Sequence, residues 1–166
     1  MMRPIRNERG VTLVELSVVG ALIGILAALS IPKWFEAMPR IRTKAEVRNV
    51  ISTLREARSL AVATKNPFGV NFNQADNKFT LFVDTDSPQD KAYTQSDSVI
   101  VSTEIKHGVK IQYDTFGNNT VVFDPDGAAS ASGHVMLTSE DYQNQFSIDV
   151  LASTGRVKLF EGYPTD

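Results

Sequence analysis

The chain has 166 residues, a formal net charge of −2 and no cysteine. This length suits one modest domain together with a short terminal segment. The lack of cysteine excludes a disulfide framework and a metal site built from thiolates.

The first ten residues are a basic leader in front of a long apolar run. The leader contains three arginines and one acidic residue, Arg3, Arg6, Arg9 and Glu8. Positive charge before an apolar run predicts that the N-terminus stays in the cytoplasm while the rest of the chain crosses the membrane. We therefore interpret residues 1–10 as a cytoplasmic leader peptide.

Residues 11–32 are predicted to form a transmembrane helix. No charged side chain occurs from Leu16 to Pro32, and a helix starting at Val11 would be roughly 30 Å long, enough to cross a bilayer core. Glu15 lies inside this segment, where an ionised carboxylate costs at least about 2.5 kcal/mol and should have a partner. A cut after Gly10 would create an amine on Val11, one helical turn from Glu15 in the same copy or close to it in a neighbouring copy.

Two simpler interpretations of the apolar run remain open. An ordinary secretory signal could be cleaved near its small residues, Ala27, Ala28 and Ser30, or the segment could be an uncleaved anchor. Neither interpretation gives Glu15 a role.

Small residues and prolines mark the predicted membrane helix. Gly20 and Gly24 are four residues apart, a spacing that lets helices approach closely in a membrane, although such residues are also common there without a special role. Pro32 and Pro39 each remove a helical hydrogen bond, so we expect a kinked or locally loosened helix between them.

Residues 33–65 are predicted to form an amphipathic helix that ends at Asn66-Pro67. Apolar residues recur at helical spacing and require a sheet to pack on. They are Met38, Ile41, Ala45, Val47, Val50, Ile51, Leu54, Ala57, Leu60 and Ala61. The remaining surface is basic, with eight basic and three acidic residues from Lys33 to Lys65.

Residues 66–166 are predicted to form a β-rich globular head. Alternating apolar residues predict strands at 69–73 and 78–83. Turn residues separate six further strand candidates, at 99–105, 109–113, 120–123, 134–137, 145–151 and 156–160. Short strands separated by turns predict an antiparallel sheet or a small sandwich. The fold class is therefore α+β, with a long N-terminal helix packed on an antiparallel all-β C-terminal head.

Several of these segments resemble a known family. Gly10, Val11, Thr12-Leu13, Glu15 and the apolar run to Pro32 resemble the class III signal of type IV pilins and type II secretion pseudopilins. Ala57-Arg58, the VFDPDG sequence at 122–127 and Gly155-Arg156 resemble the GspH/FimT branch of minor pilins. The resemblance spans nearly the whole chain.

The resemblance implies a pilin fold and a structural role without an enzymatic activity or a cofactor. A prepilin peptidase would cut between Gly10 and Val11 and methylate the new N-terminus, and Glu15 would dock the subunit into a filament. Most family members begin the mature chain with Phe, where Val11 stands here. The implied location is the bacterial inner membrane, crossed once, with a periplasmic head. The implied partners are the peptidase, other pilins or pseudopilins, the inner-membrane assembly platform and lipid.

Two further groups of residues are weaker candidates for binding sites. Asp84, Asp86 and Asp90 have carboxylates that could bind calcium, although a solvated acidic loop explains them as well. Arg156 and Lys158 lie where some FimT-type pilins have a basic region implicated in DNA uptake. The head has six basic and fourteen acidic residues, hence a net charge of −8, so we do not expect DNA as a partner.

Alternative functions are a DNA-binding minor pilin for natural transformation and a membrane-anchored adhesin or enzyme. Arg55 and Arg58 on the amphipathic helix could pair with acidic residues of the head, in the same copy or in another one.

Overall fold

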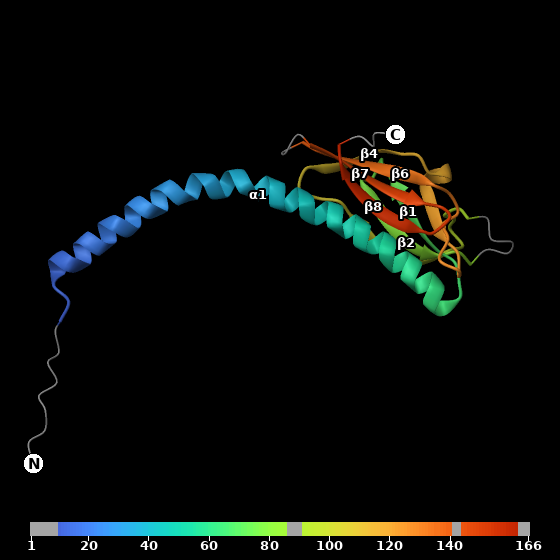
Figure 1. Ribbon diagram of the computed structural model, residues 1–166, viewed down its shortest axis with the longest axis horizontal. Coiled ribbons are helices and arrows are strands. Elements are labelled where there is room, and N and C mark those ends of the chain that lie inside the picture. The colour runs from blue at the N-terminus through green and yellow to red at the C-terminus, as the bar shows by residue number, and fades with distance from the viewer. Residues whose placement is uncertain (1–9, 86–90, 141–143, 163–166) are drawn as a thin grey trace, which may run out of the picture. The chain divides into compact units, whose positions relative to one another are not determined.

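The computed structural model describes residues 10–85, 91–140 and 144–162 and divides the chain into two compact units, residues 1–38 and 39–166. One long helix, α1 (Leu13–Thr64), is followed by strands only, apart from a short 3₁₀ turn (Figure 1). The predicted order of a long helix followed by a β-rich head is confirmed.

The first unit contains the start of α1. The hydroxyl of Thr12 accepts a hydrogen bond of 3.2 Å from the backbone N–H of Glu15, so Thr12 caps the helix. The helix continues without interruption through Pro32 and Pro39, and it is not locally unwound at either proline. Among the residues that the structure describes, no helix is both long and apolar enough to cross a membrane.

The second half of α1 forms part of the core of the head. Its buried apolar residues follow the predicted helical spacing and are Val47, Val50, Ile51, Leu54, Ala57 and Ala61. The predicted stripe started earlier, but Ile41 is 58% exposed, and burial begins at Thr43, whose hydroxyl bonds to that of Ser139 at 2.8 Å. The helix ends at Thr64, because Lys65 has a left-handed φ of 59° and its N–H bonds to the Ala61 carbonyl.

All eight predicted strands are present, with bounds that differ by at most two residues. They are β1 (Phe68–Asn73), β2 (Lys78–Val83), β3 (Ser98–Glu104), β4 (Val109–Asp114), β5 (Thr120–Phe123), β6 (Gly133–Ser139), β7 (Asn144–Leu151) and β8 (Arg156–Glu161). They form two antiparallel four-stranded sheets, in the orders β3-β2-β1-β5 and β4-β6-β7-β8.

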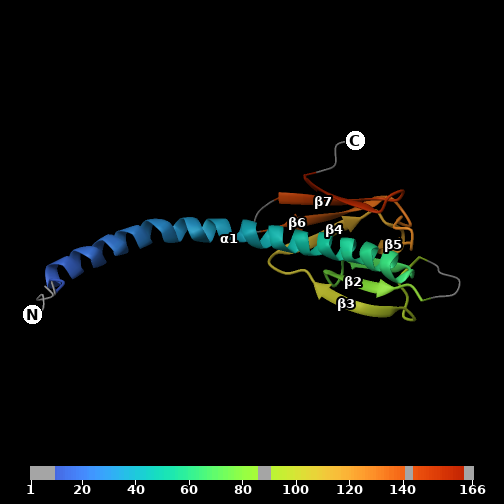
Figure 2. The same ribbon diagram turned by 60° about the horizontal axis from the view of Figure 1, so that its bottom comes forward.

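The core of the head lies where α1 meets both sheets. Figure 2 shows the head part of α1 with β2 and β3 on one side and β6 and β7 on the other. One cluster of buried side chains joins Leu54 of the helix to Phe72 and Phe79 of the first sheet and to Phe146 and Ile148 of the second. The helix therefore closes the gap between the sheets.

The outer face of the first sheet has a smaller apolar contact of its own. Phe82 is fully buried and packs against Tyr93, with ring centroids 5.0 Å apart. Gly69 is the cross-strand partner of Phe82, and a Cβ at this glycine would overlap the phenyl ring. The strand pair therefore requires a residue without a side chain at position 69.

Candidate functional site

The residues predicted for processing and docking lie at the start of the chain's helix. Gly10 is exposed and Val11 is 73% exposed, both just before the first turn of α1. Glu15 is also exposed and belongs to that first turn. No described residue forms an ion pair with its carboxylate. The predicted cut site is thus accessible in the single chain, and Glu15 is available for a partner.

The predicted helix-packing residues also lie on α1. A Cβ built at Gly20 or Gly24 would meet nothing within 4 Å, so the surface at both glycines is open in the single chain. Pro32 is part of the helix, but its side chain lies outside the described ones. Their role in helix packing stays a prediction, because a single chain contains no neighbouring membrane helix.

The three head motifs, at 57–58, 122–127 and 155–156, come together in space. The Nε–H of Arg58 on α1 donates a hydrogen bond of 3.0 Å to the carbonyl of Gly127. Gly155 lies against the same carbonyl, so that a Cβ at this position would collide with it. The glycines have left-handed φ angles of 87° and 59°, which favour residues without a side chain.

Backbone hydrogen bonds hold the two turns that carry these glycines. The N–H of Gly127 donates to the Asp124 carbonyl at 2.8 Å, and the N–H of Gly155 donates to the Leu151 carbonyl at 2.8 Å. Asp124 also forms an ion pair of 2.8 Å with Lys91. The Asp126 carboxylate accepts a hydrogen bond of 2.9 Å from the N–H of Ala128, so this aspartate stabilises the turn, as its residue type indicates.

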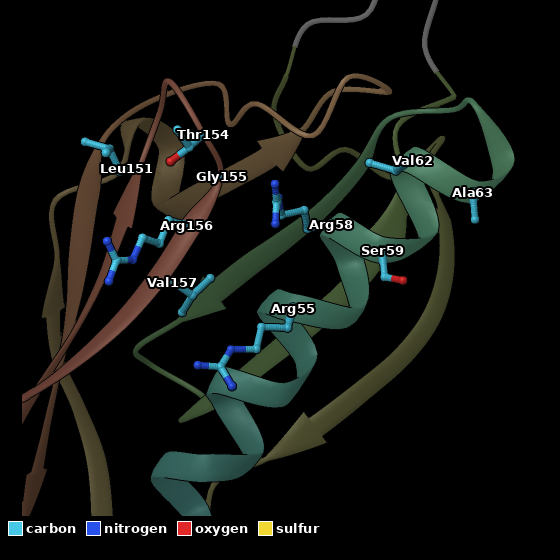
Figure 3. A pocket seen from close by; sticks show the side chains of 10 residues that line it. All are labelled: Arg55, Arg58, Ser59, Val62, Ala63, Leu151, Thr154, Gly155, Arg156 and Val157. Atoms are coloured by element: carbon cyan, nitrogen blue, oxygen red, sulfur yellow. The ribbon is translucent and has the colours of Figure 1, made fainter.

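A cleft of about 980 Å³ opens beside this cluster, between α1 and the hairpin formed by β7 and β8 (Figure 3). Arg55 and Arg58 extend into it from the helix, and Arg156 belongs to the hairpin on the opposite side. Apolar and small side chains line the rest of the cleft. They are Ser59, Val62, Ala63, Leu151, Thr154, Gly155 and Val157.

The cleft brings three arginines together without an acidic partner. Within the described parts of the chain, no carboxylate forms an ion pair with Arg55, Arg58 or Arg156. The described acids that pair with a lysine lie elsewhere, in the pairs Lys44–Glu161, Lys78–Asp76, Lys91–Asp124 and Lys110–Glu140. Among the described residues, neither Arg55 nor Arg58 pairs with an acid of its own head, and Arg58 bonds to a backbone carbonyl instead. Pairing with acids of another copy stays a prediction.

The candidate calcium ligands do not form a described site. Asp84 is buried, with an exposure of 2%, and its backbone N–H bonds to the Pro67 carbonyl. Asp86 and Asp90 lie outside the described residues. The described ranges contain no group of three or more His, Cys, Asp or Glu side chains placed to hold a metal ion.

The candidate nucleic-acid residues are both exposed on β8. The Lys158 ammonium lies 4.2 Å from the centroid of the Phe160 ring, and Asp149 is the cross-strand partner of Lys158. A second cleft of about 440 Å³ beside them is lined by His134, Asp149 and both basic residues, among others. Its charges are mixed, which does not suit a polyanion.

Two carboxyl groups of the head have shifted pKa values. Burial raises the pKa of Asp114 above its ordinary value of 3.8, even though its carboxylate accepts hydrogen bonds from Phe116 and Asn119. A hydrogen bond from Lys44, together with its charge, lowers the pKa of Glu161. The ion pair between Lys44 Nζ and Glu161 Oε1, 2.9 Å apart, links the end of β8 to α1.

Sequence reasoning did not find the arginine cleft. Arg55 and Arg58 are 101 and 98 positions away from Arg156, and only the packing of α1 against the last hairpin brings them together. The only available signal was that two of the three head motifs contain an arginine, Arg58 and Arg156.

Comparisons with known proteins agree with the fold. The family model described as type II transport protein GspH matches residues 46–154. Two solved structures of the minor pseudopilin EpsH from the type II secretion system of Vibrio cholerae are similar, each with a TM-score of 0.55. They are 14% and 13% identical to this chain, and the matches cover 72% and 75% of it and 97% of each EpsH chain.

No curated protein matches the chain. The EpsH structures are too different in sequence to show more than a shared fold, whereas the family model covers most of α1 in the head and β1 to β7. The chain belongs to the GspH family of type II transport proteins.

Proposed function

We propose that this chain is a minor pseudopilin, a structural subunit of a type II secretion pseudopilus. Membership of the GspH family and the fold shared with EpsH support this role. The observation that carries the proposal is the amount of apolar surface that the start of α1 exposes around one acidic residue.

Eleven large apolar side chains between Val11 and Leu29 are exposed by 46% to 81%. They are Val11, Leu13, Val14, Leu16, Val18, Val19, Leu22, Ile23, Ile25, Leu26 and Leu29. Exposed apolar surface of this extent marks a segment that is covered by lipid or by other helices. We therefore infer that residues 11–32 first anchor the subunit in the inner membrane, with the head in the periplasm, and then pack in the filament.

Glu15 favours docking of the subunit in one position over other contacts in the membrane. Prepilin peptidase cuts after Gly10 and methylates the amine of Val11. In the filament, Glu15 meets the Val11 amine of a neighbouring subunit, and the two opposite charges neutralise each other in an apolar environment. Because the carboxylate is costly in lipid and paired only after docking, docking in the correct position is favoured over other contacts in the membrane.

Mass spectrometry of the intact protein tests the processing step. The chain is expressed in membranes with and without a prepilin peptidase, and the mature form should begin at N-methylated Val11 only when the peptidase is present. Recovery of the mature chain with the major pseudopilin of sheared filaments tests assembly. A mature chain that begins at any other residue, or that is absent from the filaments, would refute the proposal.

A further inference from the structure

We propose that the cleft between α1 and the β7–β8 hairpin is a docking site for an acidic segment of another subunit. Arg55, Arg58 and Arg156 would bind the carboxylates of that segment. This inference rests on the proposed function, since it assumes that the head works in contact with other subunits, and it adds the chemistry of the partner.

The charges of the cleft point to a carboxylate ligand. Its lining contains three guanidinium groups and no acidic side chain, and none of the three is neutralised by a described residue. A guanidinium matches a carboxylate with two parallel hydrogen bonds, and it is more weakly hydrated than an ammonium group. Arginines are therefore suited to bind acidic side chains at a protein interface.

The shape and the apolar part of the cleft favour a peptide segment. A volume of about 980 Å³ is large enough for several residues. Val62 and Leu151 line it and remain 40% and 51% exposed. An occupant that alternates carboxylates with apolar side chains would cover these residues and pair the arginines at the same time.

Part of the cleft is already held in a fixed conformation. Arg58 is tied to the Gly127 carbonyl, and Gly155 packs tightly against both the carbonyl and the arginine side chain. A site that is formed before binding loses less conformational entropy on association. Arg55 and Arg156, which have no such contact in the described structure, can then adjust to the ligand.

A nucleic acid fits this surface less well than an acidic peptide does. A duplex carries one negative charge per about 1.7 Å of its axis, and its phosphates would extend beyond the cleft over a head with a net charge of −8. The neighbouring basic residue Lys158 faces Asp149 and stacks on Phe160. The few carboxylates of a short peptide can all lie close to the three arginines.

Fluorescence anisotropy of the full chain in neutral detergent micelles tests this inference. The probe is a short labelled peptide that alternates Glu and Leu, and its control is the same peptide with Gln in place of Glu. We expect the acidic peptide to bind at least about tenfold more tightly than its neutral twin, with an affinity that falls as salt is added.

Variants locate the binding. The double variant R55E/R156E should weaken binding of the acidic peptide by about tenfold or more, whereas R42E, at an exposed arginine of α1 outside the cleft, should leave it unchanged. Equal binding of the two peptides, or equal binding by the double variant, would overturn the inference. Tighter, arginine-dependent binding of a DNA duplex would also overturn it and would assign the cleft to nucleic acid.

Self-association offers a further way for the inference to fail. If the chain forms oligomers that R55E/R156E abolishes while the acidic peptide does not compete, the cleft is an interface between copies and the inference is wrong. The proposed function is judged separately, because the mature N-terminus and recovery in filaments do not depend on peptide binding.

Discussion

Arg58 and Gly127, 69 positions apart in the chain, are joined by a hydrogen bond of 3.0 Å from the guanidinium Nε–H to the backbone carbonyl. Gly155 packs against the same carbonyl from the β7–β8 turn. The bond therefore fixes α1 to the turn at Gly127, and the β7–β8 turn packs against both partners of the bond. The motifs that resemble the GspH/FimT branch are, in this structure, the parts of one joint, and the joint forms a wall of the arginine cleft.

The variant G155A should destabilise the head by at least about 2 kcal/mol. An alanine there must adopt a left-handed φ of 59°, which costs roughly 1 kcal/mol. Its Cβ would also displace the Gly127 carbonyl or the Arg58 side chain, which adds to the cost. Urea unfolding of the full chain in detergent measures the change.

Gly162 is the matched control for this variant. It also has a positive φ, 94°, but a Cβ there would meet nothing within 4 Å. G162A should cost only about 1 kcal/mol, the backbone part of the penalty. Equal losses in the two variants would show that the contact with Gly127 and Arg58 contributes nothing.

The variant G69A should destabilise the head by about 1–3 kcal/mol, since its methyl group would overlap the ring of Phe82 in a packed sheet. In the background F82L, which removes the ring, the cost should fall by about 1 kcal/mol or more. G117A is the control, because a Cβ at position 117 has open space. Additive effects of G69A and F82L would contradict the proposed overlap.

Local sequence signals were sufficient to predict the elements of the head. All eight strands were found because each is a short run bounded by turn residues, and some, such as Lys78–Val83, also alternate apolar and polar residues. The assignment of β3 to one sheet and β4 to the other was not predictable. Which sheet a strand joins depends on packing between distant residues, such as Leu54, Phe79 and Phe146 of the common core, that no short window contains.

The same limit explains which site residues were missed. Glu15 and Gly10 were identified because their signal lies within six positions. Arg55 and Arg156 were each singled out for a different reason, but they line one cleft only because α1 packs on the second sheet, and no short window of sequence contains that relationship. The start of burial at Thr43 was also missed, because an apolar side chain such as Ile41 follows the helical period whether or not a sheet covers it.

The stability of the head should depend on the ionisation of Asp114. Burial raises its pKa in the folded state above 3.8, so folding favours the protonated carboxyl. The stability that Asp114 contributes is therefore complete below its pKa in the unfolded chain and is lost as the pH rises through its pKa in the folded chain. The variant D114N stays neutral and keeps an acceptor for the Phe116 N–H. Its free energy of unfolding, relative to the unsubstituted chain, should therefore increase from acidic to neutral pH.

Carboxyl-carbon NMR of the full chain gives the pKa of Asp114 directly, and urea unfolding at both pH values gives the difference in stability. E140Q is the control, since Glu140 is an exposed partner of Lys110. A midpoint for Asp114 at or below 3.8, or a stability difference that does not change with pH, would refute the role of burial.

Glu15 has two possible roles that substitutions can separate. Its N–H is bonded to the Thr12 hydroxyl, and a Thr followed three residues later by Glu is the pattern of a helix capping box. Its carboxylate could therefore matter for the start of the helix or, as proposed here, for pairing with a Val11 amine. Gln also fits the capping box, so E15Q removes the charge and keeps the cap.

We predict that E15Q and E15A both leave membrane insertion intact and strongly reduce recovery of the chain in sheared filaments. T12A, which removes the cap at a cost of about 1 kcal/mol to the helix start, should assemble nearly as well as the unsubstituted chain. Immunoblots of membrane and filament fractions measure both steps. If E15Q assembles normally while T12A fails, Glu15 acts through the cap, because the lost helix start and not the lost charge then accounts for the defect.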